Sequence, residues 1–163
     1  MHDVLDESLA PAALGDDAEY AAFLAAQYAA RLPVERWVAE RDLPDAPPPQ
    51  CHLIVDDLAA LDTVVPAPTK SFELPANADP VGAYWALAGS ALGNRAILNR
   101  RRKLGRSAPV RFLSDEAMPN YFKLLRPRLE RPTTLADARS AIRAAKAVFE
   151  QFLLTQDAVR LAA

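Results

Sequence analysis

Two glycines placed one turn apart inside a helical pattern constrain this chain more than any other feature. The stretch from 84 to 95 reads Y-W-A-L-A-G-S-A-L-G-N-R and carries Gly89 and Gly93. A glycine inside a helix costs about 1 kcal/mol relative to alanine, so two on one face need a reason. At about 100° per residue, five positions fall within one narrow arc: Gly82, Ala86, Gly89, Gly93 and Ile97. The pattern predicts a helix with a groove almost free of side chains, which a flat molecule or another backbone can approach closely.

Composition limits the possible classes of protein. The chain has 163 residues, of which 51% are hydrophobic and 25% charged, which suits one compact helical domain over residues 1–163. A formal net charge of −2 gives the whole protein no electrostatic reason to bind nucleic acid or a membrane surface. Cys51 is the one cysteine, and the acidic N-terminus lacks the features of a signal peptide, so we expect a cytoplasmic protein with no membrane span.

The fourteen prolines cluster between segments, and β-branched residues are sparse, which is typical of an all-α bundle. Asp16, Asp79 and Thr134 stand where helix N-caps are expected, and Gly105 stands where a C-cap glycine is expected. Pro33 should kink or end the helix in which it lies. We therefore expect helices over residues 3–9, from Asp16 or Asp17 to 41, 51–62, 80–105, from Ser114, and from Thr134.

Most enzyme motifs are missing. The sequence contains no G-x-S-x-G elbow, no P-loop, no G-x-G-x-x-G fingerprint and no E-x-x-H pair. The basic run over residues 95–106 is best interpreted as a solvated helix end. A docking face for an acidic protein and a nucleic-acid contact remain as alternatives. Metal chemistry would have to involve His2 or His52, although a single histidine is more often a surface or capping residue.

Five segments in chain order carry a resemblance to a known family. They are H-D-V-L-D-E-S-L from His2, the pattern of Tyr20, Phe23 and Leu24, D-D-L-A-A-L over 56–61, the glycine segment, and A-A-K-A-V-F over 144–149. Together they resemble the heme oxygenase family, specifically its bacterial biliverdin-producing branch, whose distal helix is usually written Y-V-L-E-G-S-T-L-G-G. Only the glycine segment is specific by itself, and the others gain weight from order and spacing.

The resemblance implies a single-domain heme-oxygenase-like helical bundle in which heme lies between the first helix and the glycine helix. His2 would match the proximal iron ligand, and Gly89 and Gly93 would bring helix backbone close to the distal face of the heme. Tyr84 and Lys146 occupy positions that lie near the heme propionates in the family. Ser90 would help to position a distal water, with Asn94 or Arg95 as further options.

The reaction implied by the resemblance is O₂-dependent opening of heme, which serves as both substrate and cofactor, with release of biliverdin, Fe²⁺ and CO. Electrons would come from an external ferredoxin or flavoprotein reductase, for which the basic run would be the docking face. The expected partners are therefore heme and an electron-donor protein, without nucleic acid or membrane.

The chain departs from the family pattern at three places, and two other functions compete with the enzyme. Only Met1 precedes His2, Ala88 replaces a usual glutamate, and Asn94 replaces a usual glycine. One alternative is a heme-binding or carrier protein on the same scaffold without turnover. The other is a helical interaction module that packs a partner helix on the groove. Close packing of Gly89 and Gly93 inside the bundle is the simplest structural explanation.

Overall fold

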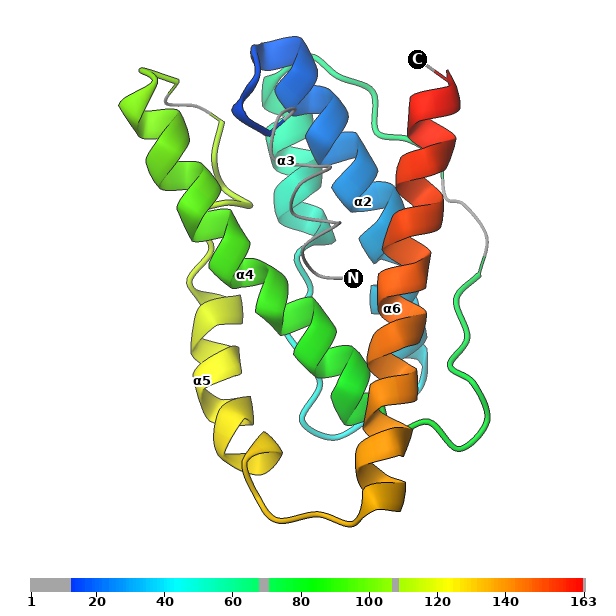
Figure 1. Ribbon diagram of the computed structural model, residues 1–163. Helices are drawn as coiled ribbons and strands as arrows, with labels where there is room; N and C mark the ends of the chain where they lie inside the picture. Colours follow the sequence, from blue (N-terminus) through cyan, green and yellow to red (C-terminus); the bar gives the residue numbers. More distant parts are fainter. Residues whose placement is uncertain (1–12, 68–70, 107–108, 163) are drawn as a thin grey trace.

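The computed structural model describes residues 13–67, 71–106 and 109–162, with side chains described as far as Thr155. This part of the chain forms helices and no strands, which confirms the all-α prediction (Figure 1). The expected helix over residues 3–9, together with His2, lies outside the described residues. The helices are α2 (Asp17–Glu40), α3 (Cys51–Ala60), α4 (Pro80–Lys103), α5 (Ala117–Leu129) and α6 (Leu135–Ala162).

The predicted caps are present at the helix ends. Asp16 forms a reciprocal capping box with Glu19 at the start of α2, which satisfies two backbone donors. Asp79 Oδ1 accepts a hydrogen bond from Val81 N at the start of α4, and Thr134 Oγ1 accepts one from Asp137 N before α6. Gly105 follows α4 with a φ of 73°, the left-handed conformation that a helix C-cap requires and that glycine adopts without strain.

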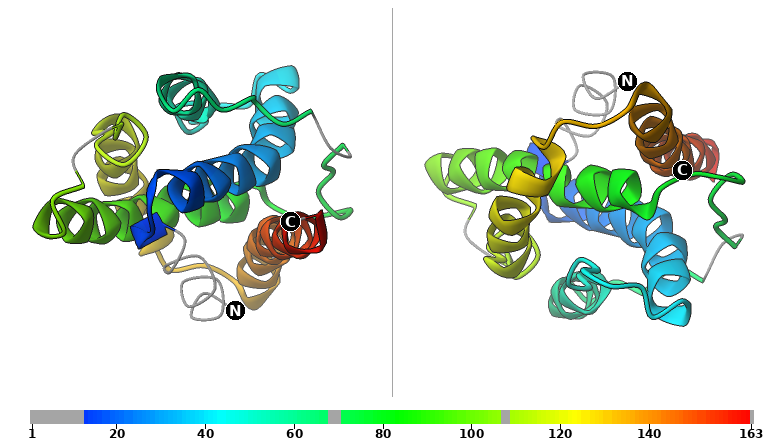
Figure 2. Two further views of the ribbon diagram at one scale, coloured as in Figure 1. Left: turned by 90° about the horizontal axis from the view of Figure 1, so that it is seen from above. Right: turned by 90° about the horizontal axis from the view of Figure 1, so that it is seen from below.

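Helix α2 continues past Pro33 on a new axis, as predicted, whereas α5 begins later than the predicted Ser114. Pro33 lies inside α2, which continues to Glu40, and Figure 2 shows the axis of α2 changing direction in its second half. The helix α5 begins at Ala117 because both carboxylate oxygens of Asp115 accept hydrogen bonds from the first backbone N–H groups, those of Ala117 and Met118. Asp115 therefore caps α5, although it lies one residue outside the N-cap position.

The helices α4 and α6 make their closest approach at Gly82. A Cβ atom on Gly82 would lie 1.8 Å from the carbonyl oxygen of Ala141, so only glycine permits this contact. Beyond this crossing the two helices diverge, as Figure 1 shows. The side-chain-free stripe that the sequence predicts along α4 therefore has two parts. Among the described helices, one packs against the part at Gly82 and none against the part at Gly89 and Gly93.

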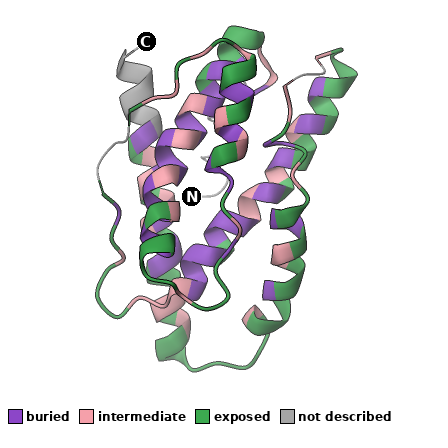
Figure 3. Cartoon of the chain, turned by 180° about the vertical axis from the view of Figure 1, so that it is seen from behind, coloured by how far each residue is buried: buried purple, intermediate pink, exposed green. Residues whose placement is uncertain are grey.

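Burial divides the interior into two main clusters that share α2 and α4 (Figure 3). One cluster joins α2, α4 and α6 and includes Val34, Trp37, Leu87, Val148 and Phe152. The other joins α2 and α3 to the end of α4 and the segment before α5, and includes Leu24, Ile54, Leu58, Leu98 and Phe112. The boundary between these two clusters therefore runs across the middle of both α2 and α4.

Replacing Gly82 with alanine should destabilise the protein. The added methyl group would overlap the backbone of α6, and overpacking of this kind typically costs about 1–3 kcal/mol. Chemical denaturation of the G82A variant should show the loss as a lower midpoint. Ala83→Gly, at the next position of the same helix, is the control for altered helix propensity, and an unchanged midpoint in G82A would contradict the close approach.

Candidate functional site

The part of the surface of α4 at Gly89 and Gly93, here called the glycine face, is not covered by the described residues. A Cβ atom placed on either glycine would meet no described atom within 4 Å. The packing of the described residues therefore does not require glycine at these positions, in contrast to Gly82. Close helix–helix packing, the simplest structural explanation, does not account for the two glycines in this part of the chain.

Apolar side chains flank the glycine face, and Lys146 is exposed on the neighbouring helix α6. Trp85, one turn before Gly89, makes an edge-to-face contact with Phe149 of α6 at a ring-centroid distance of 6.1 Å. Leu92 lies beside Gly93 in the sequence and is 61% exposed. Lys146 precedes Phe149 by one turn, and its exposed ammonium group lies 3.7 Å from Glu150 Oε1. The structure thus places Lys146 on the helix that faces this end of α4.

Ser90 already uses its hydroxyl proton within the fold. Ser90 Oγ donates a hydrogen bond to the carbonyl oxygen of Leu87 at 2.7 Å, and it accepts one from Arg31 Nη2 at 2.8 Å. A hydroxyl has one proton to donate, so in this arrangement Ser90 can accept a further bond but cannot donate one. The predicted role of Ser90 in holding a distal water is therefore limited to that of an acceptor.

Arg31 of α2 is the functional candidate that sequence reasoning missed. Its side chain is fully buried, and its Nε and Nη1 atoms have no hydrogen-bond partner. Nη1 lies 3.9 Å from Glu35 Oε1, and the two oxygens of Glu35 each accept a bond from a backbone N–H at the start of α3. Burial lowers the pKa of the Arg31 guanidinium, while Glu35 opposes that shift. A buried cation with free donors is costly to a fold and marks a site worth testing.

The Arg31 guanidinium lies where the two hydrophobic clusters meet. Its central carbon is 5.6 Å from the ring centroid of Phe112 and 5.9 Å from that of Phe152, distances at which aromatic faces attract a cation. A sequence signal for this position exists, because Arg31 continues the buried spacing of Phe23, Leu24 and Gln27 along α2. An arginine at a core position of an amphipathic helix is the sequence pattern that indicates this buried charge.

Asn94 of α4 is a second buried donor on the same side of the helix as Ser90. It lies four residues after Ser90, is 7% exposed, and its Nδ2 atom has no acceptor. Asn94 occupies the position where the resembling family usually has a glycine. It lies about 100° around the helix from Gly93 and 140° from Gly89, so it places a buried polar group beside Ser90 and not on the glycine face.

Asp57 of α3 holds the ring of Phe112 in place. Its buried carboxylate accepts hydrogen bonds from the backbone N–H groups of Arg111 (2.9 Å) and Phe112 (3.0 Å). Burial raises the pKa of Asp57, and the two backbone hydrogen bonds oppose that shift. The aromatic neighbour of Arg31 thus depends on a carboxylate from a different helix.

Tyr84, predicted to lie near the heme propionates, is not brought to the glycine face. It precedes Gly89 and Gly93 by five and nine residues, which places it about 140° and 180° away around the helix. Tyr84 is buried, its hydroxyl has no partner, and burial raises its pKa. Of the two histidines, His52 is exposed on α3 and His2 lies outside the described residues.

The basic run at the end of α4 is only partly solvated, contrary to the interpretation as a solvated helix end. Arg101 is fully buried, its guanidinium lies 3.7 Å from the ring centroid of Tyr20, and it donates to the carbonyl oxygen of Ala13. Arg95 pairs with Glu116 at 2.9 Å. The exposed basic side chains at this end are Arg100, Arg102 and Lys103.

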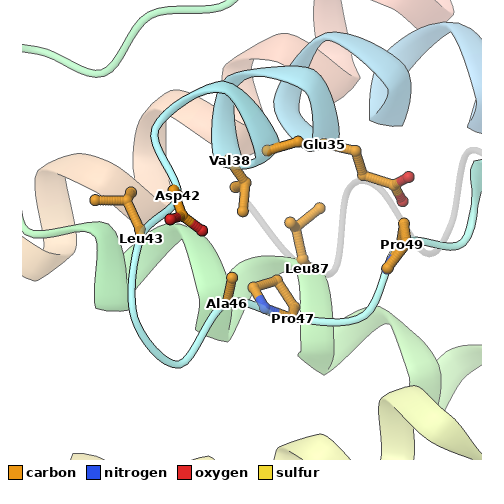
Figure 4. A pocket seen from close by; sticks show the side chains of 9 residues that line it. Glu35, Val38, Asp42, Leu43, Ala46, Pro47, Pro49 and Leu87 are labelled. Atoms are coloured by element: carbon orange, nitrogen blue, oxygen red, sulfur yellow. The ribbon is translucent and has the colours of Figure 1, made fainter.

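Two cavities lie elsewhere on the described residues. One of about 210 Å³ lies between α2, the 42–49 loop and Leu87 (Figure 4), and one of about 340 Å³ lies between α3 and the 109–114 segment; small-molecule sites begin at roughly 300 Å³. Among the described residues, no group of three or more histidine, cysteine or acidic side chains could hold a metal ion. No helix in the same part of the chain is long and apolar enough to cross a membrane.

Comparison of the chain with protein-family models, with curated proteins and with solved structures finds no match. The functional argument for this protein therefore depends on its own residues and on the geometry described above.

Replacing Gly89 or Gly93 with alanine should stabilise the protein. The added methyl group meets no described atom, and alanine favours a helix interior by about 0.8–1.0 kcal/mol over glycine. Each single variant should therefore gain roughly 0.5–1 kcal/mol in the free energy of unfolding, measured by chemical denaturation. A loss of stability in both variants would show that the glycine face is filled by other atoms.

Proposed function

We propose that this protein is a heme oxygenase that binds heme against the glycine face of α4 and cleaves it to biliverdin with release of Fe²⁺ and CO. The observation that carries the proposal is the open space at Gly89 and Gly93. Two glycines weaken α4 without being needed for packing, which is typical of a position kept for a ligand at the expense of stability.

The residues around the glycine face fit a porphyrin. A flat macrocycle needs a surface without projecting side chains, and the exposed backbone at Gly89 and Gly93 supplies one. Trp85, Phe149 and Leu92 offer apolar contacts for the edge of the ring. Lys146 would pair with a propionate in exchange for its exposed contact with Glu150. His2 remains the proposed iron ligand.

The chain would contribute binding, orientation and exclusion of water. When bound, heme supplies both the iron that activates O₂ and the macrocycle that is opened. The backbone at Gly89 and Gly93 would set how closely the distal face approaches α4, and Ser90 would accept a hydrogen bond there. Arg100, Arg102 and Lys103 would form the positive surface for an acidic ferredoxin or flavoprotein reductase.

Heme titration under anaerobic conditions should give a Soret band that saturates at one heme per chain. Addition of O₂ with ascorbate or reduced ferredoxin should then replace the Soret band with the absorption of biliverdin, because the iron needs an external electron source. The His2→Ala variant should lose the Soret band or change its ligation state. A Soret band without biliverdin would favour the heme-binding or carrier protein, and no Soret band would favour the interaction module.

A large side chain on the glycine face should block heme. Leucine at Gly93 would occupy the space that the porphyrin needs, so we expect at least about tenfold weaker heme binding, a loss of roughly 1.4 kcal/mol. Asn99→Leu is the matched control, because it adds the same side chain to an exposed part of α4 about 120° from Gly93. Equal heme affinity in G93L and N99L would place the ligand elsewhere.

A further inference from the structure

Two buried side chains that adjoin Ser90 have hydrogen-bond donors without acceptors among the described residues. The unpaired donors are Nε and Nη1 of Arg31 and Nδ2 of Asn94. Arg31 reaches Ser90 from α2, and Asn94 follows Ser90 by one turn on α4, so Ser90 connects the two positions. Buried donors without partners are rare in folded proteins and each costs free energy.

The oxygen atoms of Glu35 and Ser90, which lie near Arg31, already accept other hydrogen bonds or one from Nη2. Glu35 binds two backbone N–H groups, and its closest approach to Arg31 is 3.9 Å, which is too long for a hydrogen bond. Ser90 Oγ satisfies only Nη2. Gln50 Oε1 also has no hydrogen-bond partner. The Nε2 group of the same amide donates a hydrogen bond to Asp115 Oδ2 at 2.6 Å, which fixes the orientation of the Gln50 side chain. The free donors of Arg31 therefore call for an acceptor from outside the described chain.

We propose that Arg31 and Asn94, on either side of Ser90, form a binding site for a carboxylate group. A guanidinium presents its N–H groups as a planar fork that matches the two oxygens of a carboxylate, and a bond between ions in a buried setting is strong. The amide N–H of Asn94 would add a neutral donor to the same ligand.

Two sources could provide the carboxylate, and the site is the same for both. One is a free small acid such as formate, and the other is an acidic side group of a flat ligand on the glycine face. Only the second depends on the proposed heme function. The site itself goes beyond that function, because Arg31 is not among the residues to which the resemblance assigns a role.

The first experiment uses the heme-free protein and sodium formate, with sodium chloride at equal ionic strength as the reference. Formate at about ten times its dissociation constant should raise the melting temperature of the wild type by roughly 3 °C or more over chloride. Arg31→Met should abolish this difference. Arg101→Met is the matched control, because Arg101 is equally buried and also has two unpaired donors, Nε and Nη2, but lies under the ring of Tyr20 two helical turns after Asn94, and it should keep the difference.

A second measurement keeps the proposal testable if Arg31→Met does not fold. The Nε–H resonance of Arg31 in ¹⁵N-arginine-labelled protein, assigned with Arg31→Lys, should shift on titration with formate, while that of Arg101 should not. Absence of a formate effect in the wild type by both methods would overturn the site if hemin and hemin dimethyl ester also bind equally. An effect that persists in Arg31→Met would overturn it as well.

The source of the carboxylate is identified by comparing hemin with hemin dimethyl ester. If the porphyrin supplies the carboxylate, the wild type should bind hemin at least about tenfold more tightly than the ester, and Arg31→Met should bind both equally. A formate effect with equal binding of the two porphyrins would support a site for a free acid. If no porphyrin binds at all, the heme proposal fails, while the formate result still decides the carboxylate site.

Discussion

The contact between Gly82 and the backbone of Ala141 sets the geometry on which the rest of the molecule depends. It brings α4 and α6 together at one end, and the divergence of the two helices beyond it leaves the middle of α4 uncovered by α6 (Figure 1). A single small residue thus creates both a tight crossing and, further along the same helix, an open surface. The two glycines on that surface then have a purpose distinct from that of Gly82.

The structure combines this open surface with a charge that the hydrophobic interior does not neutralise. Arg31 lies between two apolar clusters, close to two aromatic rings and a serine, with its nearest carboxylate engaged by the start of α3. A hydrophobic side chain of similar size would be expected to serve stability equally well at such a position. A buried arginine is therefore better understood through what it can bind than through what it stabilises.

Much of the fold could be predicted from the sequence because its signals are local. The caps at Asp16, Asp79 and Gly105 act within one turn of their own position, and the structure confirms each of them. The structure also agrees with the predicted continuation of α2 past Pro33, which follows from the position of the proline within the helical pattern. The division of the glycine stripe at Gly82 depends on where α6 crosses, which no local pattern contains.

The residues of the candidate site also differ in how far the sequence alone predicts their positions. Gly89 and Gly93 stand out in the sequence because their helical cost is a property of the residues themselves. The positions of Arg31 and Tyr84 in the fold cannot be predicted in this way. Arg31 donates a hydrogen bond to Ser90, which lies 59 residues later in the sequence, and Tyr84 lies on the opposite side of α4 from the two glycines. Two sequence features would help to place such residues. They are a charged residue within an apolar stripe and the angular position of each motif residue around its helix.

The carboxylate of Asp57 on α3 influences the surroundings of the buried Arg31 guanidinium at the centre of the molecule. By binding the N–H groups of Arg111 and Phe112, it holds the segment that presents the Phe112 ring to Arg31. The position of an aromatic ring beside the central charge is therefore set by a carboxylate that does not itself touch Arg31, which makes α3 part of the environment of the guanidinium.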